Sequence, residues 1–350
     1  MKRKLIRMFF LIIMTMMLSC EEPETVVTNI VHPDGSVTRK VEMKNFVNKF
    51  DISALQIPLD STWIVSDSLE FTGEGDTIWV RRAEKLFKNY DEINRTYKAD
   101  SGYNKATSRR TEFSRKFKWF YTEYRFAEII NKTIPDGYPV SDFLNLEELQ
   151  WFYSPQYISN EKKSGPDSLK FRALSDTVGI KTEKWIIKCI ATQWVAEFGK
   201  LTAGRAYEDM TTESLKILQD NLAGIIEANS EEFDSLWSAG IIFKDFAGED
   251  YASKYKTEAD SAMNLAVEKI LIDFNDYTVR IAMPGKLTGT NGLIDSARLL
   301  LWPVKSDYFL AQNYEMWAES KTSNIWAWVV SGVFILFVLT GMVVRAMKKG

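Results

Sequence analysis

The feature that most restricts the fold is a stretch of twenty residues near the C-terminus, from Ile325 to Val344, that contains no charged side chain. As an α-helix it would be about 30 Å long, which matches the hydrocarbon core of a bilayer. Indole rings favour the membrane interface and basic residues favour the cytoplasmic side. The flanking residues that fit this pattern are Trp326 and Trp328 at one edge, and Arg345, Lys348 and Lys349 beyond the other. We predict a transmembrane helix over 325–344 and a cytoplasmic basic tail over 345–350; the alternative is a buried core helix.

The N-terminus has the pattern of an export signal. A basic start is followed by an apolar run, Met8 to Leu18, which is too short to span a bilayer comfortably. Ser19 and Cys20 then resemble the lipobox of bacterial lipoproteins, although Met17 replaces the usual leucine. We predict a signal peptide over 1–19 and lipidation of Cys20. The alternative is an ordinary or uncleaved signal with a free cysteine.

The two ends predict the same topology. The basic N-terminal start and the basic C-terminal tail both belong in the cytoplasm, so the residues between them lie outside. We therefore expect a single-pass protein of the bacterial cytoplasmic membrane. Its ectodomain faces the periplasm or exterior, and its C-terminus is cytoplasmic.

Composition disfavours several classes of function. The net charge of −3 gives no basic field for nucleic acid. With one histidine, His32, and two cysteines, the chain lacks the ligands for a His/Cys zinc site. Cys189 lies among isoleucines and is expected to be a buried, inert thiol. We predict no catalytic set, no metal and no cofactor, although the many carboxylates leave a glycosidase-like pair open.

The ectodomain is strand-rich at both ends and helical in the middle. Thr25–Val31 and Ser36–Met43 flank a Pro-Asp-Gly turn and predict a β-hairpin. Helical periodicity runs from Ser141, expected to cap a helix, to Leu271, and alternation returns at Tyr277. We predict an α+β fold with an antiparallel sheet built from N- and C-terminal strands. Its parts are a β-rich segment over 20–135, a helical insertion over 136–275 and further strands over 276–320.

The densest aromatic stretch, Phe113 to Ile130, predicts one long strand. Its alternative is helical spacing. Functionally, the stretch is a candidate apolar groove for a lipid or a peptide, and otherwise it is a sheet strand buried on both faces. The candidate groove residues are Phe117, Trp119, Tyr121, Tyr124 and Phe126.

The order of these features resembles that of LppM-like membrane-anchored bacterial lipoproteins. The matching positions are Asp34-Gly35-Ser36, Met283-Pro284-Gly285, Asn291-Gly292 and Trp302. They cover about a quarter of the chain, and the long helical middle departs from the compact pattern. The resemblance implies a non-enzymatic envelope domain with some likeness to lipid-binding folds.

The sequence thus predicts a non-catalytic envelope lipoprotein whose ectodomain binds a membrane lipid or an envelope protein near the membrane. The alternatives are a carboxylate-dependent hydrolase of envelope glycans and a structural subunit of a membrane complex. Nucleic acid is not an expected partner.

Overall fold

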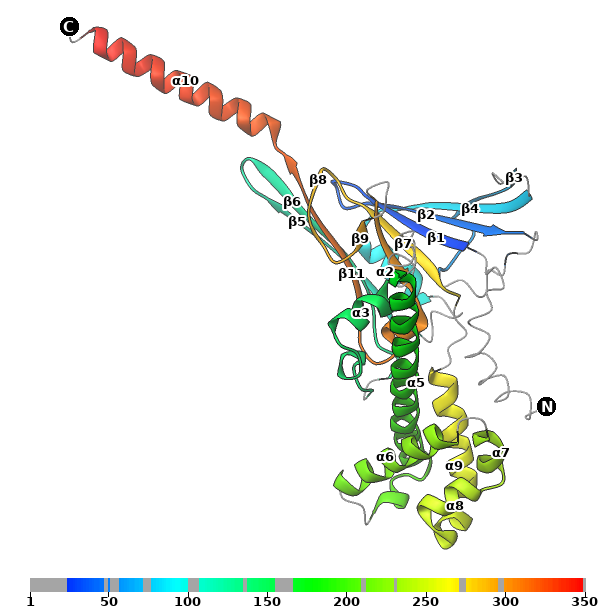
Figure 1. The fold of residues 1–350 in the computed structure, drawn as a ribbon. Coiled ribbons are helices and arrows are strands. Elements are labelled where there is room, and N and C mark those ends of the chain that lie inside the picture. The colour runs from blue at the N-terminus through cyan, green and yellow to red at the C-terminus, as the bar shows by residue number, and fades with distance from the viewer. Residues whose placement is uncertain are drawn as a thin grey trace. The chain divides into compact units, whose positions relative to one another are not determined.

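The computed structural model describes residues 24–46, 50, 57–71, 77–99, 107–134, 137–154, 166–208, 212–229, 232–270, 275–294 and 299–348. These residues form two compact units, which are described separately (Figure 1). Unit 1 contains the described residues of 131–276 and 305–314. Unit 2 contains 24–130, 277–304 and 315–348. The predicted signal peptide and Cys20 lie outside the described residues.

The larger sheet of unit 2, sheet A, has the strand order β3-β4-β2-β1-β7-β10-β9 among the described residues. Its inner face carries the core because alternate residues along β1 and β2 are buried. The strands are β1 (Glu24–Val31), β2 (Val37–Asn45), β3 (Ile64–Phe71), β4 (Thr77–Phe87), β7 (Tyr277–Ala282), β9 (Leu293–Ile294) and β10 (Leu300–Val304).

The predicted hairpin is confirmed as β1 and β2, which pair antiparallel from Glu24↔Lys44 to Val31↔Val37. Gly35 adopts a φ of 92°, which a residue with a side chain rarely takes. The carboxylate of Asp34 accepts the Ser36 amide at 3.0 Å. The Pro-Asp-Gly signal therefore closes this turn as expected.

The smaller sheet of unit 2, sheet B, has the order β5-β6-β11-β8. Its strands are β5 (Arg109–Phe117), β6 (Tyr121–Ile130), β8 (Lys286–Thr290) and β11 (Tyr314–Ser323), and α2 (Tyr90–Ala99) packs beside β5. The prediction of one strand over Phe113–Ile130 is wrong. The chain reverses between β5 and β6, and Lys118 N–H donates to Tyr121 O at 2.8 Å across the turn. No glycine, proline, asparagine or aspartate marks this turn.

The predicted α+β class with an antiparallel-dominated sheet is confirmed, because each sheet combines strands from both ends of the chain that precedes α10. One pair departs from antiparallel: β1 and β7 run parallel, with Val27 opposite Val279. The strands next to the two predicted anchors lie in different sheets, β1 in sheet A and β11 in sheet B.

Two glycines lie on either side of β8 in short connecting segments. Gly285 precedes β8 with a φ of 77°. Gly292 lacks a positive φ, and its small size matters for another reason: a Cβ there would collide with the indole of Trp302. The indole Nε1–H of Trp302 donates to Asn291 Oδ1 at 3.0 Å, so Trp302 anchors this turn.

Unit 1 is helical, and one apolar cluster fills its core. Its helices are α3 (Leu146–Tyr153), α5 (Pro166–Leu201), α6 (Thr212–Ala228), α7 (Phe233–Ser238), α8 (Ile241–Ala247) and α9 (Glu249–Ile270). One face of α5 is largely buried: Trp185, Cys189 and Phe198 are each 0% exposed. Burial raises the pKa of Cys189 to about 12, as suits an inert thiol.

The first of these helices begins later than expected. Ser141 was predicted as a cap, but it lies in a short 3₁₀ turn (Val140–Asp142). Asn145 caps α3 instead. Its side chain accepts the Glu148 amide at 3.0 Å, and the Glu148 carboxylate accepts the Asn145 amide at 2.8 Å. This reciprocal box fixes the helix start.

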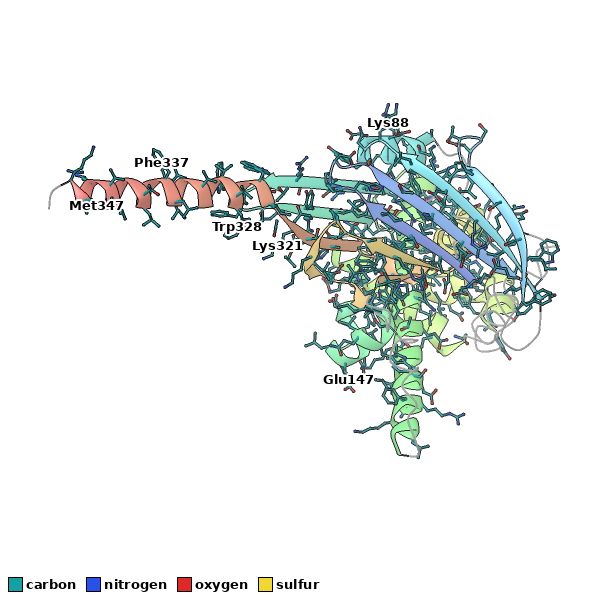
Figure 2. The ribbon with its side chains drawn as sticks, turned by 90° about the horizontal axis from the view of Figure 1, so that it is seen from above. Lys88, Glu147, Lys321, Trp328, Phe337 and Met347 are labelled. Carbon is teal, nitrogen blue, oxygen red and sulfur yellow. The ribbon has the colours of Figure 1, made fainter. Side chains whose placement is uncertain are left out.

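The last element, α10 (Ile325–Met347), is long and apolar enough to cross a membrane. Its side chains are almost all exposed, which distinguishes it from a core helix (Figure 2). Only Asn324 separates it from β11. Sheet B therefore continues into the candidate membrane span with no flexible linker between them.

Candidate membrane-interface site

The turn between β5 and β6 carries a group of exposed aromatic side chains. We call Phe117, Trp119, Phe120 and Tyr121 the aromatic tip. Phe117 is 57% exposed and Trp119 48% exposed, although both are large and apolar. Exposed aromatic residues gathered on one turn mark an interaction surface.

The aromatic tip packs on the first turns of α10. Phe117 stacks on Trp326 with ring centroids 6.2 Å apart, and Trp119 meets the same indole edge-on at 5.2 Å. Phe120 contacts Trp328 at 4.3 Å. The two tryptophans predicted for the membrane interface therefore share one surface with the tip.

Asn324 joins the tip to the helix by hydrogen bonds. Its amide N–H donates to Phe120 O at 2.9 Å, and its side-chain Nδ2 donates to the carbonyls of Lys118 at 2.7 Å and Trp119 at 3.2 Å. Its Oδ1 accepts the Thr122 hydroxyl at 3.0 Å. Asn324 thus pairs the polar groups of the β5–β6 turn and links that turn to the junction between β11 and α10.

A further bond reaches along the helix. The indole Nε1–H of Trp119 donates to the Ser331 hydroxyl at 2.9 Å. Ser331 lies six residues after Ile325, or about 9 Å along the axis. If α10 enters a bilayer at Ile325, Trp119 lies at the depth of the headgroup and upper acyl region, where indoles are favoured.

We predict that Asn324→Ala loosens the junction. The variant removes two exposed hydrogen bonds, to the carbonyls of Lys118 and Trp119, each worth about 0.5–1.5 kcal/mol. Hydrogen exchange of the Lys118 amide should accelerate by about tenfold or more. Asn291→Ala, which disturbs another turn of unit 2, is the matched control and should leave Lys118 unchanged. Equal acceleration in both variants would contradict the assigned role of Asn324.

The five residues predicted as one groove do not lie together on one open surface. Phe117, Trp119 and Tyr121 belong to the exposed aromatic tip. Tyr124 and Phe126 are 4% and 0% exposed and belong to the filled core of unit 2. The difference follows from the unpredicted turn, which separates the exposed end of the aromatic stretch from its buried end.

The core of unit 2 contains a buried ion pair that the sequence analysis did not select. The guanidinium of Arg39, on β2, donates to the carboxylate of Glu128, on β6. Asn29 bridges the two, accepting from Arg39 Nε at 2.7 Å and donating to Glu128 Oε2 at 2.9 Å. All three are 0–1% exposed. The sequence does contain an indication of this pair, because Arg39 lies among the alternate residues of β2 that are buried and otherwise apolar.

A second arginine extends this network. Arg109 donates to the hydroxyl of Tyr277 and lies over the ring of Tyr97, 5.0 Å from its centroid. Burial alone would raise the pKa of Glu128, but the charges of Arg39 and Arg109 outweigh it and hold that pKa below its ordinary value. Burial raises the pKa of Tyr277 to about 12. Arg39 and Glu128 form an ion pair, and Arg109 is held by the hydroxyl of Tyr277 and the ring of Tyr97. The network therefore fits a structural role in joining sheets A and B.

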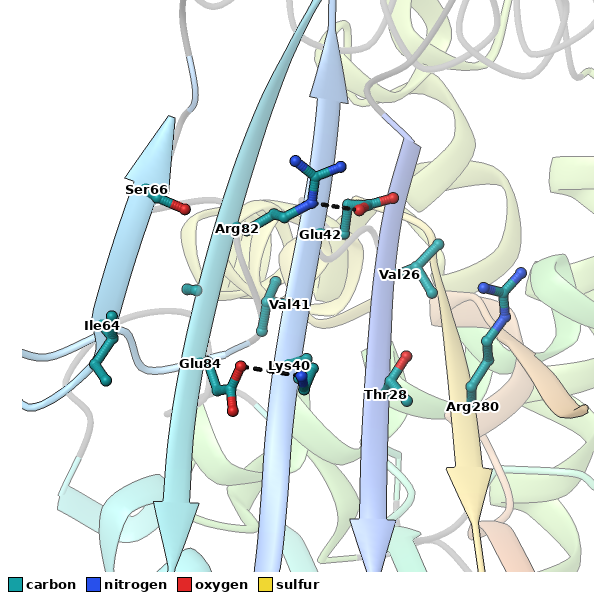
Figure 3. Close-up of a pocket in the computed structure, with 11 residues that line it drawn as sticks. Val26, Thr28, Lys40, Val41, Glu42, Ile64, Ser66, Arg82, Glu84 and Arg280 are labelled. Carbon is teal, nitrogen blue, oxygen red and sulfur yellow. Dashed lines mark hydrogen bonds and ion pairs between the residues drawn. The ribbon is translucent and has the colours of Figure 1, made fainter. Parts of the chain in front are cut away.

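The outer face of sheet A is hollowed into a shallow groove of ≈ 430 Å³ (Figure 3). Most of the charged residues that line the groove form ion pairs with one another. Lys40 pairs with Glu84 at 3.1 Å, and Arg82 pairs with Glu42 at 2.9 Å.

Unit 1 contains a carboxyl group, that of Asp307, whose pKa is raised well above its ordinary value. Burial, with the nearby charge of Asp276, raises the pKa of Asp307 to about 6. Lys305 lies 3.2 Å from Asp276 and opposes this effect. A carboxyl group with a raised pKa next to a second acid is a feature of some hydrolases.

The remaining predicted site residues are the basic residues at the end of α10 and the cysteine predicted to be lipidated. Arg345 and Lys348 end α10 as expected, whereas Lys349 and Cys20 lie outside the described residues. Within the described ranges, no group of histidine, cysteine and acidic residues is arranged to hold a metal. No family model, curated protein or solved structure matches this chain.

Proposed function

We propose that this chain is a single-pass, non-catalytic envelope protein whose ectodomain is held on the outer face of the bacterial cytoplasmic membrane and binds lipid there. The observation that carries the proposal is the packing of the aromatic tip on the first turns of α10. A turn fixed to a membrane span and covered with exposed aromatic residues suits the interfacial region.

Two further features support the proposal. Asn324 is the single residue between β11 and α10, and it is bonded to the turn that carries the tip. A bilayer around α10 therefore lies next to the tip. Lipidation of Cys20 would add a second anchor ahead of β1, and two anchors give more stable attachment than one chain alone.

Bromolipid quenching tests this proposal on the full-length chain in phosphatidylcholine nanodiscs. Bromine on the acyl chains quenches only indoles that approach the bilayer. Trp119→Phe is expected to reduce the quenched share of the tryptophan emission, because it removes an indole from the interface. The control is Trp63→Phe, which removes a buried indole from unit 2 and should not reduce it. An unchanged quenched share in Trp119→Phe would place the tip in water and overturn the proposal.

The rival function is a carboxylate-dependent hydrolase of envelope glycans, and the raised pKa of Asp307 is the observation that favours it. In that case the full-length protein would release reducing ends from peptidoglycan. The Asp307→Asn variant would lose that activity while keeping its fold.

A further inference from the structure

The membrane-facing end of sheet B carries exposed basic side chains around the aromatic tip. We call this group the basic collar; its members are Lys116, Lys118, Lys286 and Lys321. We propose that the basic collar binds the phosphate groups of anionic lipids in the outer leaflet. This inference rests on the proposed function and names the lipid class that the site prefers.

The collar is assembled from three strands and one turn. Lys116 lies at the end of β5 and Lys118 in the turn beside Trp119. Lys321 of β11 lies opposite Lys286 of β8, three residues before Asn324. Figure 2 shows Lys321 next to the junction with α10, close to Trp328. Residues far apart in the sequence thus place positive charge at one level, just above the start of the candidate span.

The pairing of charges distinguishes the collar from the rest of the unit. On sheet A, Arg81 pairs with Asp67 at 2.7 Å and Lys85 with Asp60 at 3.3 Å. On sheet B, Arg125 holds both Glu315 and Glu319 within 3.0 Å. Among the described residues, the collar side chains have no ion pair within 4 Å. Like charges such as Lys286 and Lys321 directly opposite each other on a strand pair are unfavourable unless an anion lies between or beside them.

The local acidic groups offset the collar only in part, because no described acidic side chain forms an ion pair with a collar residue within 4 Å. Glu123 faces Lys116 across the hairpin, and Glu112 is engaged by Arg110 at 3.1 Å. The Nζ of Lys321 lies 5.7 Å from the centroid of the Tyr121 ring, so the cation is held at the edge of the aromatic tip. Aromatic rings at the depth of the acyl boundary with lysines just above them form the arrangement that binds anionic headgroups.

The occupant is a lipid headgroup because of this continuity with α10. Once α10 is inserted in a bilayer, lipid headgroups surround the collar, and a soluble phosphate would have to compete with them. One basic side chain near an anionic surface contributes a factor of about five in affinity. Several act together here, so the preference for anionic over neutral lipid should be measurable.

Native mass spectrometry provides the test. The full-length chain is reconstituted in nanodiscs of phosphatidylcholine and phosphatidylglycerol, and the lipids that stay bound on release are counted. The wild type should retain phosphatidylglycerol about fivefold or more over its share in the disc. The variant Lys116→Gln, Lys118→Gln, Lys286→Gln, Lys321→Gln should lose about fivefold or more of this enrichment, since a neutral amide has no charge for the phosphate. The basic residues at the other end of α10 are the same in both proteins and do not contribute to the difference.

The control variant changes the same number of exposed lysines elsewhere: Lys98→Gln, Lys170→Gln, Lys216→Gln, Lys254→Gln. It has the same net charge as the collar variant and should keep the wild-type preference. Loss of preference in both variants, or no preference in the wild type, overturns the inference. If Trp119 is quenched by bromolipid while phosphatidylglycerol is not enriched, only the collar inference fails; if Trp119 is not quenched, the proposed function fails as well.

Discussion

Arg39→Met is expected to destabilise unit 2 by about 3–5 kcal/mol, because it leaves the buried carboxylate of Glu128 without its main partner. At about 1.4 kcal/mol per factor of ten, hydrogen exchange of the β1 and β2 amides should accelerate by more than about a hundredfold. Exchange resolved by segment is the suitable measurement, because unit 1 then serves as an internal reference.

Two further variants show whether the lone charge is the cause. Arg39→Met combined with Glu128→Leu removes both charges of the pair and should recover part of the lost protection; Arg109 then keeps its bond to Tyr277 but lacks the nearby carboxylate. Arg125→Met removes a partly exposed arginine that pairs with Glu315 and Glu319, and it should cost only about 0–1 kcal/mol. A double variant as unstable as Arg39→Met alone would mean that packing, not charge, is the contribution of Arg39.

The same pair gives unit 2 a defined acid sensitivity. The pKa of Glu128 is lower in the folded protein than its ordinary value of 4.5, so the folded state binds fewer protons than the unfolded state. The stabilisation by Glu128 is therefore complete above about pH 4.5 and is lost as the pH falls through the folded pKa. Exchange of β1 measured over that acid range should show this loss in the wild type, and the Arg39→Met, Glu128→Leu variant should lack it.

Replacing the tip with Phe117→Ser, Trp119→Ser and Phe120→Ser is expected to release sheet B from the helix junction. The variant removes three ring contacts with Trp326 and Trp328, and full burial of one such ring is worth about 1.5–3 kcal/mol. Even partial loss should increase the rocking of the ectodomain on α10. Fluorescence anisotropy of a probe on sheet A, in nanodiscs, should show a shorter rotational correlation time.

The matched control places three serines on the exposed apolar residues of β3, as Ile64→Ser, Leu69→Ser and Phe71→Ser. These residues lie on the same unit but away from α10, so the ectodomain should keep the slow rotation of the wild type. Equal mobility of the wild type and the tip variant would show that the tip does not hold the domain.

The sequence was a good guide where the signals are local. The hairpin of β1 and β2 followed from Pro-Asp-Gly, and α10 followed from the absence of charge over 325–344. The reversal at Lys118–Phe120 was not predictable in this way, because it is fixed by Asn324, which lies about two hundred residues later.

The candidate site was missed for the same reason. Trp119, Trp326 and Lys321 were each visible as aromatic or basic residues, but their proximity depends on β6 pairing with β11. The resemblance to LppM-like lipoproteins and the lipidation of Cys20 stay predictions. Arg39 was visible as a charged residue in an apolar row, a pattern that calls for a buried partner, but no periodicity identifies Glu128 as that partner.

The central claim is that the aromatic tip lies in the membrane interface, and the depth of a spin label at position 120 tests it most directly. The label is attached to Phe120→Cys in a Cys20→Ser background; Cys189 is buried with its pKa raised to about 12 and stays unlabelled. In nanodiscs, oxygen should reach this label more readily than a water-soluble nickel complex, at a depth of about 5–10 Å below the headgroups. A label at the exposed Ser66 of sheet A should show the reverse. Equal access of the nickel complex to both positions would contradict the account.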